Sequence, residues 1–235
     1  MRQRSERMVK QTHWGLALPA IILAAAAAFL LARAHYAQAP DANHRTVRQF
    51  MLYLTFSRVD DPIIVLGDSI VEASTLPTAL CGHMIVNGGL NGASTASDLG
   101  GWLAAALANK RAFAIIVSLG VNDALTPTPP TRQIFESRYG SLLRELSQLT
   151  ARLFVVGISP VEVRGRLTPD VQKTVTATIR DFNSALPELA RQNNATFLPL
   201  PEMSAPFSID GVHLNAEGYR AWDKAVMQGA AQACG

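Results

Sequence analysis

Short apolar runs alternate with longer amphipathic stretches from residue 63 to the end of the chain. Five runs have the length and character of strands: 63–66, 83–86, 113–118, 153–158 and 196–200. Patterns of helical type separate and follow them, near residues 94–109, 132–150, 170–193 and 216–232. Alternation of this kind is typical of a parallel sheet covered by helices on both faces. We therefore predict an α/β fold, a three-layer sandwich with a central parallel sheet of about five strands.

The N-terminal part of the chain has a different pattern. Nineteen residues from Trp14 to Ala32 carry no charge, and about 20 apolar residues in a helix span the hydrocarbon core of a bilayer. We predict a basic cytoplasmic N-terminus at 1–13 and a transmembrane anchor at 14–33. The protein would then be a single-pass protein of the inner (cytoplasmic) membrane, with its remaining residues on the periplasmic or extracellular side.

A cleaved signal sequence is the alternative to an anchor. The triplets Ala32-Arg33-Ala34 and Ala37-Gln38-Ala39 resemble the small-residue cleavage site of signal peptides. The apolar run exceeds the usual core of about 7–15 residues in such peptides, and Pro40 directly follows the second triplet. These two points favour the anchor. With cleavage the protein would be secreted, so both alternatives place the domain outside the cytoplasm.

Residues 34–61 join this segment to the first strand. They mix polar residues with an apolar patch, Phe50-Met51-Leu52-Tyr53-Leu54. We interpret them as a linker leading into an amphipathic helix that docks on the domain, with contact along the bilayer surface as the alternative. The domain itself is predicted at 62–235.

The charge distribution excludes one class of partner. Residues 1–34 hold five basic residues and one acidic residue, which leaves a net −1 for the rest of a chain with a net charge of +3. A nearly neutral domain lacks the basic surface that tracks phosphates, so we expect no nucleic-acid partner.

The chain has two cysteines, Cys81 and Cys234. In an oxidising compartment they can form a disulfide, and two separate thiols are the alternative.

The run Ile63–Leu66 is followed by Gly67-Asp68-Ser69. Chemistry in open α/β sheets collects where strands end and helices begin, so Ser69 is a candidate nucleophile as well as a candidate helix cap. Two further strand ends carry suitable residues. Asn87-Gly88-Gly89-Leu90-Asn91-Gly92 can offer backbone N–H groups to an anion. Asn122, in Gly120-Val121-Asn122-Asp123, can donate to an oxyanion or belong to a turn.

A possible base lies just before the last predicted helix, in Asp210-Gly211-Val212-His213. The three-residue spacing allows the Asp210 carboxylate to accept from Nδ1 of His213 and to aim the other ring nitrogen at a nucleophile. Among the histidines after the apolar segment, His35 and His44 fall in the 34–61 segment and His83 begins a strand. By position His213 is therefore the preferred base.

These four blocks, in this order, resemble the motifs of the SGNH (GDSL-type) hydrolase family over roughly residues 62–232. The resemblance implies a flavodoxin-like sheet, Ser69 as nucleophile, His213 as general base and Asp210 as its orienting carboxylate. It also implies an oxyanion hole made of the Ser69 N–H, the Gly92 N–H and the Asn122 side chain, with Gly89 as the competitor of Gly92. Ile70 replaces the family's leucine. The triad order also matches α/β-hydrolases, but the second glycine of G-x-S-x-G is missing.

The expected function is an extracytoplasmic serine esterase that acts on an O-acylated carbohydrate or lipid, a small-molecule or glycan ester. The alternatives are an O-acyltransferase of an envelope polysaccharide and a non-catalytic carbohydrate-binding domain. The chain lacks H-E-x-x-H and paired C-x-x-C patterns, so no metal or other cofactor is predicted. Substrate specificity is expected in the loops 124–131 and 159–168, where Glu162, Arg164 and Arg166 either meet a polar ligand or are simply solvated.

Overall fold

The computed structural model describes residues 42–165 and 167–235. The predicted cytoplasmic N-terminus, the segment 14–33 and the first residues of the 34–61 segment lie outside these ranges. Within the described ranges no helix is long and apolar enough to cross a membrane. Everything from Ala42 onward belongs to one compact unit, which therefore includes a helix that precedes the predicted start of the domain at residue 62.

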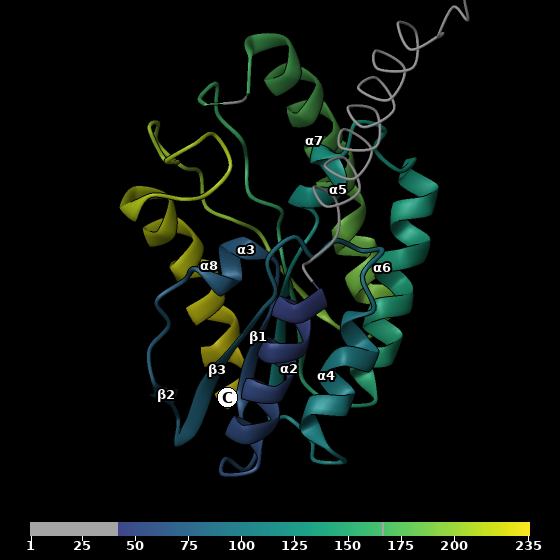
Figure 1. Ribbon diagram of the computed structural model, residues 1–235, viewed down its shortest axis with the longest axis vertical. Coiled ribbons are helices and arrows are strands. Elements are labelled where there is room, and N and C mark those ends of the chain that lie inside the picture. The colour runs from purple at the N-terminus through teal and green to yellow at the C-terminus, as the bar shows by residue number, and fades with distance from the viewer. Residues whose placement is uncertain (1–41, 166) are drawn as a thin grey trace, which may run out of the picture. The chain divides into compact units, whose positions relative to one another are not determined.

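The centre of this unit is a six-stranded sheet in the order β2-β3-β1-β4-β5-β6 (Figure 1). Its strands are β1 (Ile63–Gly67), β2 (Ala79–Leu80), β3 (His83–Gly89), β4 (Ala114–Ser118), β5 (Leu153–Val156) and β6 (Thr196–Leu198). All pairs are parallel except the β2–β3 hairpin. The five predicted strands are confirmed. All five residues of β1 are buried, as expected of a strand covered on both faces.

Strand β2 was not predicted. It has only two residues, and a two-residue turn joins it to β3. Both turn residues have positive φ, 54° for Cys81 and 83° for Gly82, as in a type I′ hairpin turn. A two-residue strand is too short to show an alternating pattern, and Cys-Gly is not one of the usual turn pairs.

Seven helices are described: α2 (Ala42–Phe56), α3 (Ser69–Glu72), α4 (Leu99–Leu107), α5 (Val121–Leu125), α6 (Arg132–Ser147), α7 (Pro169–Gln192) and α8 (Ala216–Cys234). The four long predicted helices are confirmed as α4, α6, α7 and α8. The short helices α3 and α5 were not predicted, because a single turn has no visible period. Residues 124–125 accordingly belong to α5, and the predicted loop 124–131 begins only at Thr126.

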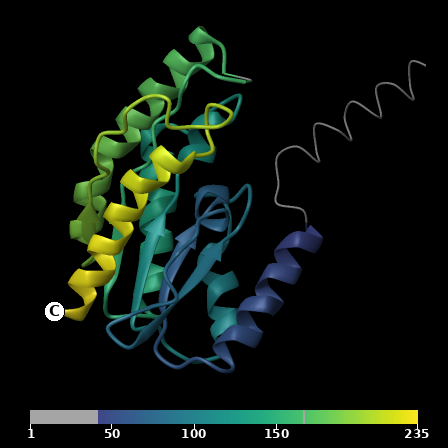
Figure 2. The same cartoon turned by 90° about the vertical axis from the view of Figure 1, so that its left-hand side faces the viewer.

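The helices cover both faces of the sheet. Figure 2 shows α8 on one side of the strands and α2 on the other. Helix α2 packs on α4, where it buries Leu52 and Phe56. Helix α8 packs on β4, β5 and β6, and Nε1 of its buried Trp222 donates to Oγ of Ser118 at 3.0 Å. Within the 34–61 segment, residues 42–56 therefore form a helix that packs on the domain.

Cys81 and Cys234 form a disulfide, with their Cα atoms 6.3 Å apart and 153 residues apart in sequence. The bond ties the β2–β3 turn to the last residue of α8. It therefore fastens the end of the helix that follows His213 to the far edge of the sheet.

We expect a Cys81→Ser, Cys234→Ser double variant to unfold more easily than the wild type. A disulfide restricts the unfolded chain, and closing a long loop typically contributes about 2–4 kcal/mol. The measurement is the thermal midpoint of both proteins, with the reduced wild type as a control that should match the variant. Two free thiols in the denatured, unreduced wild type would contradict the bond itself.

Candidate active site

The turn after β1 presents Ser69 at the carboxyl end of the sheet. Asp68 caps α3 by accepting from the Ile70 N–H at 2.9 Å, so Ser69 becomes the first residue of that helix. Strand β1 passes very close to β4 at this point, since a Cβ on Gly67 would lie 2.0 Å from the Ser118 carbonyl oxygen. From α8, the Tyr219 hydroxyl donates to the Ile70 carbonyl at 2.8 Å. The serine turn is thus held from both sides.

The structure brings Ser69, His213 and Asp210 into one hydrogen-bonded chain. Ser69 Oγ lies 3.0 Å from His213 Nε2, and His213 Nδ1 lies 2.7 Å from Asp210 Oδ2. The His213 and Asp210 side chains are 40% and 50% exposed, so the site opens to solvent. With Nδ1 protonated, Nε2 is the free acceptor beside a serine hydroxyl, which is the arrangement for proton removal.

Hydrogen bonds within the loop before α8 fix the positions of Asp210 and His213. Oδ1 of Asp210 accepts from the backbone N–H groups of Val212 at 3.0 Å and His213 at 2.8 Å. Gly211 makes the turn possible with φ of 100°. Partial burial acts to raise the pKa of Asp210, but the hydrogen bonds from His213 and Val212 outweigh it and lower that pKa to about 2. Asp210 is therefore an anion at any pH of physiological interest.

The two other predicted oxyanion donors lie in the segments that follow β3 and β4, the strands on either side of β1. Asn122 lies in α5, next to the carboxyl end of β4, and its Nδ2 donates to the Ala93 carbonyl at 2.8 Å. An amide NH₂ has two hydrogens, so this bond fixes the side chain and leaves one hydrogen for an anion. Gly92 precedes Ala93 and has φ of 74°. Within the part of the chain that the structure describes, the N–H groups of Ser69 and Gly92 donate to no protein acceptor.

Gly89, the competing donor, is already engaged. Its N–H donates to Oδ1 of Asn87 at 2.9 Å. A Cβ at this position would lie 2.1 Å from the Glu72 nitrogen, so the glycine is needed for close contact with α3. The geometry therefore favours Gly92 over Gly89 as the donor.

A buried acid holds Thr95, three residues after Gly92. Asp123 accepts from the Thr95 N–H at 3.0 Å and from the Thr95 hydroxyl at 2.5 Å. Burial raises the pKa of Asp123, and burial raises the pKa of Asp68 to about 7. Asp68 and Asp123 stand beside Ser69 and Asn122 in sequence. They act through backbone and side-chain hydrogen bonds that fix the two turns.

Helix α2 supports the same region from outside, which sequence reasoning missed. Arg48 donates to the carbonyl oxygens of Gly89 at 3.0 Å and Asn87 at 3.1 Å. Its neighbour on the helix, His44, lies 2.9 Å from the Glu72 carboxylate, and another oxygen of that carboxylate accepts from the Asn91 N–H at 2.5 Å. No sequence pattern marks these contacts, because they join residues between 19 and 41 positions apart.

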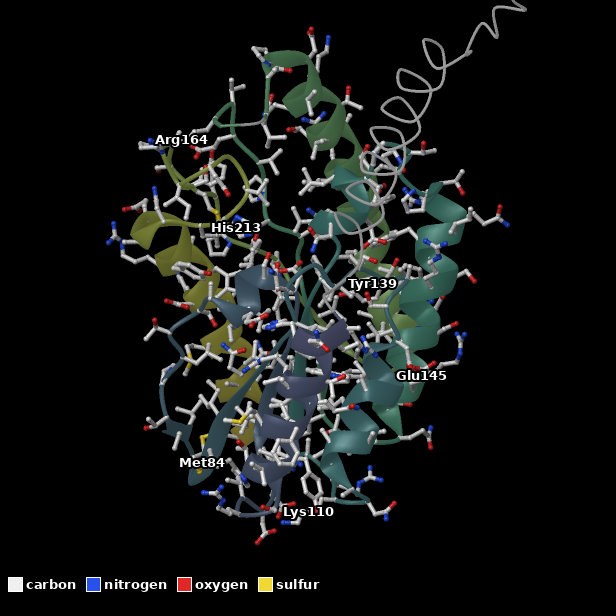
Figure 3. The ribbon with its side chains drawn as sticks, in the orientation of Figure 1. Met84, Lys110, Tyr139, Glu145, Arg164 and His213 are labelled. Atoms are coloured by element: carbon white, nitrogen blue, oxygen red, sulfur yellow. A yellow bond between two sulfur atoms is a disulfide. The ribbon has the colours of Figure 1, made fainter. Side chains whose placement is uncertain are left out.

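The loop 159–168 contacts the Asp/His loop. Glu162 accepts from the backbone N–H groups of Phe207 at 3.0 Å and Ser208 at 2.8 Å, and from the Ser208 hydroxyl. Arg164 donates to the Ser208 carbonyl at 2.7 Å, and Figure 3 shows it at the same end of the molecule as His213. Neither side chain is merely solvated. Arg166 lies outside the described residues.

No group of three or more His, Cys, Asp or Glu side chains within residues 42–165 and 167–235 is arranged to hold a metal ion. The arrangement that is present, a serine beside a carboxylate-oriented imidazole and several N–H donors, is suited to attack on a carbonyl carbon with a tetrahedral intermediate. Because the sheet order is β3-β1-β4, the turn that carries Ser69 lies between the segments that carry Gly92 and Asn122.

Solved structures with the same fold are numerous. A protein from Streptococcus pneumonia, provisionally named a platelet activating factor, has a TM-score of 0.65 at 23% identity over 86% of this chain and 98% of its own. The acetyl xylan esterase AlAXEase has a TM-score of 0.57 at 16% identity over 71% of this chain and 98% of its own. An acetylxylan esterase from Geobacillus stearothermophilus has a TM-score of 0.53 at 16% identity over 72% of this chain and 93% of its own.

No relative was found among curated proteins. The model of the GDSL-like lipase/acylhydrolase family matches residues 65–221, a range that begins in β1 and ends in α8 and contains all four blocks. The expected resemblance is thereby confirmed. The chain is a serine hydrolase that belongs to the GDSL-like lipase/acylhydrolase family.

Proposed function

We propose that this protein is an extracytoplasmic esterase that hydrolyses an O-acyl ester of a carbohydrate or lipid through an acyl-serine intermediate on Ser69. The observation that carries the proposal is the hydrogen-bonded chain from Ser69 Oγ to His213 Nε2 at 3.0 Å and from His213 Nδ1 to Asp210 at 2.7 Å. A serine without such a base is a weak nucleophile.

In the acylation step His213 Nε2 takes the Ser69 proton while Oγ bonds to the ester carbonyl carbon. The carbonyl oxygen becomes an oxyanion, and the N–H groups of Ser69 and Gly92 with the Asn122 amide are placed to stabilise it. Collapse of the intermediate breaks the ester C–O bond, and the imidazolium returns its proton to the leaving alcohol. Water then repeats the sequence on the acyl-serine and releases the acid.

Two observations support a proposal for the acyl group and for the molecule that carries it: the similar solved structures and the exposure of the active site. Two of the similar structures are acetylxylan esterases, which supports a small acyl group on a sugar. The exposed side chains of His213 and Asp210 fit this choice, since they leave one side of the triad open to a bulky carrier. The location outside the cytoplasm rests on the uncharged run 14–32 with its basic flank, and it is supported by the disulfide.

The test is covalent labelling followed by a substrate screen. A fluorophosphonate probe should modify Ser69 in the purified full chain, as located by mass spectrometry. The substrate screen then measures the release of acetate from acetylated glycans. The control is the enzyme whose Ser69 is blocked by the probe, and a glycan that loses acetate only with the unlabelled enzyme is a substrate. A folded protein without an adduct would contradict an activated serine. Transfer of the acyl group to an added glycan in preference to water would instead indicate an acyltransferase.

The Asn122→Ala variant should lose about 10²–10³-fold in kcat with little change in KM. The oxyanion exists only near the transition state, so its donor contributes to kcat rather than to substrate binding. The measurement is steady-state kinetics on a chromogenic acetyl ester. Asn91→Ala is the matched control, because the Asn91 side chain is exposed one residue before Gly92. A pure KM effect in Asn122→Ala would point to a substrate-binding role.

The Glu162→Gln variant should lose about 10–100-fold in kcat. A hydrogen-bond donor that loses its acceptor typically costs about 1–3 kcal/mol, and a rise of that size in the activation free energy corresponds to this rate factor. Hydrogen bonds from Ser208 and Phe207 outweigh the effect of partial burial and lower the pKa of Glu162, so its carboxylate is an anion that accepts all three bonds. An amide presents its NH₂ to donors and releases the loop that carries His213. Glu136→Gln on the exposed face of α6 is the control, and equal kcat values in both variants would refute the role.

A further inference from the structure

Helix α2 has a second apolar face, which points away from the domain. Val47, Phe50 and Met51 are 58%, 57% and 52% exposed. With the partly buried Leu54 they follow the spacing i, i+3, i+4, i+7 of one helix face. Of the nine large hydrophobic side chains exposed in the described chain, four lie within the seven residues 47–53. We call Val47, Phe50, Met51 and Leu54 the outer face of α2.

The outer face is not needed to hold α2 on the domain. The inner face buries Leu52 and Phe56, and Gln49 donates to the Trp102 carbonyl on α4 at 2.8 Å. Arg48 is the only charged residue between Val47 and Leu54, and its bonds to Asn87 and Gly89 turn it inward. The outer face is therefore uncharged, and a cluster of this kind marks a contact surface rather than scattered exposed residues.

We propose that the outer face of α2 lies on the surface of a phospholipid bilayer. The argument rests on the proposed membrane anchor at 14–33. Only the residues 33–41 separate the uncharged run from Ala42, the first residue of α2, and so short a chain reaches at most about 35 Å. A bilayer that holds the run is thus always within reach of α2. Helices that lie in the interface typically bury Phe, Leu and similar residues about 5–10 Å into the headgroup boundary.

This contact also determines where the active site works. Arg48 reaches the carbonyls of Asn87 and Gly89 from the flank of α2, about 100° around the helix from Val47. The carboxyl end of β3, which leads into the turn that carries Gly92, then lies beside α2 and close to the lipid surface. The substrate class that fits this position is an acyl ester presented at the membrane, on a lipid or on a glycan attached to one.

Tryptophan quenching in vesicles tests the contact with the full chain. In a Trp14→Phe background the two remaining tryptophans, Trp102 and Trp222, are 2% and 0% exposed and report no lipid. A Phe50→Trp substitution then places a reporter on the outer face. In vesicles of phosphatidylcholine and phosphatidylglycerol, brominated acyl chains should remove most of the emission of this reporter. Gln228→Trp, at an exposed position of α8 across the sheet from α2, should keep its emission.

Quenching of the native Trp14 reports on the proposed anchor, so it distinguishes a failure of the anchor from a failure of the α2 contact. Quenching of Trp14 with no quenching at position 50 would overturn the α2 contact and leave the anchor intact. No quenching at either position would overturn both. The outer face could instead join two copies of the chain. In that case the wild type would be a dimer in detergent, Phe50→Glu would be a monomer, and the tryptophan of Phe50→Trp would stay unquenched in vesicles. This outcome would also overturn the proposal. Fluorophosphonate labelling of Ser69 in the same samples reports separately on the esterase.

A kinetic experiment tests the consequence for substrate. Phe50→Glu should reduce the rate on an acyl ester embedded in vesicles at least several-fold, while the rate on a soluble acetyl ester stays at the wild-type value. Ile134→Glu, a matched change at a residue of α6 that is 44% exposed, should leave both rates unchanged. Equal losses on both substrates, or no loss on vesicles, would overturn the assignment.

Discussion

We expect the Ser69→Ala variant to lose all measurable ester hydrolysis, a fall of about 10⁶-fold in kcat when a nucleophile of this kind is removed. Without Oγ there is no group at 3.0 Å from His213 Nε2 to attack the carbonyl carbon. The oxyanion donors and the substrate contacts remain, so any residual rate should come from them alone. The measurement is kcat on a chromogenic acetyl ester together with fluorophosphonate labelling.

The fold should not change in this variant. The only hydrogen bond of the Ser69 hydroxyl in the described chain is the one to His213, and Asp68 caps α3 in both proteins. The thermal midpoint should therefore equal that of the wild type. Ser74→Ala, which removes a hydroxyl that donates to the Val71 carbonyl just after α3, is the matched control and should stay active. Full activity in Ser69→Ala would remove Ser69 from the mechanism.

The second large effect is expected from Asp210→Asn, which should lower kcat by about 10⁴-fold. The asparagine oxygen can still accept from the N–H groups of Val212 and His213. Its NH₂ group, however, then faces His213 Nδ1 and makes that nitrogen an acceptor. The ring proton moves to Nε2, which can no longer take the proton of Ser69. Kinetics of the variant across pH measure the loss, and a wild-type pH–rate profile would contradict the assignment.

The same variant carries a stability prediction with a defined sign. The folded pKa of Asp210 is about 2, below the usual value of about 3.9. The carboxylate therefore stabilises the folded state fully above pH 4, and this contribution disappears as the pH falls toward 2. Thermal midpoints of wild type and Asp210→Asn should differ at pH 5 and converge near pH 2. A constant difference over that range would show that Asp210 is not held as a carboxylate by His213.

Much of the fold could be predicted because its central strands are continuous apolar runs. Burial on both faces gives β1 and β4 sequences that are hard to interpret in another way. Elements of one turn or two residues leave no such period, so α3, α5 and β2 appeared only in the structure. The pairing of Cys81 with Cys234 also had to come from the structure, since two cysteines allow a bridge without requiring it.

The site divides in the same way. The groups proposed for the chemistry follow strand ends or precede the last helix, and Ser69, Asn122 and His213 could therefore be named from the sequence. The residues that hold them in place could not. Glu162 reaches Ser208 and Arg48 reaches Gly89 across 46 and 41 positions of the chain. Long-range pairs of this kind depend on the packing of loops and helices, which no local pattern encodes.

The packing of α2 has a practical consequence for work with this enzyme. An expressed fragment that began at Pro62 would retain every residue of the triad but would lose the two carbonyl contacts of Arg48 and the bond from Trp102 Nε1 to the Arg45 carbonyl. It would also uncover the face of α4 that α2 now shields. Such a fragment would aggregate or turn over slowly for reasons unrelated to catalysis. Soluble versions should begin at or before Ala42.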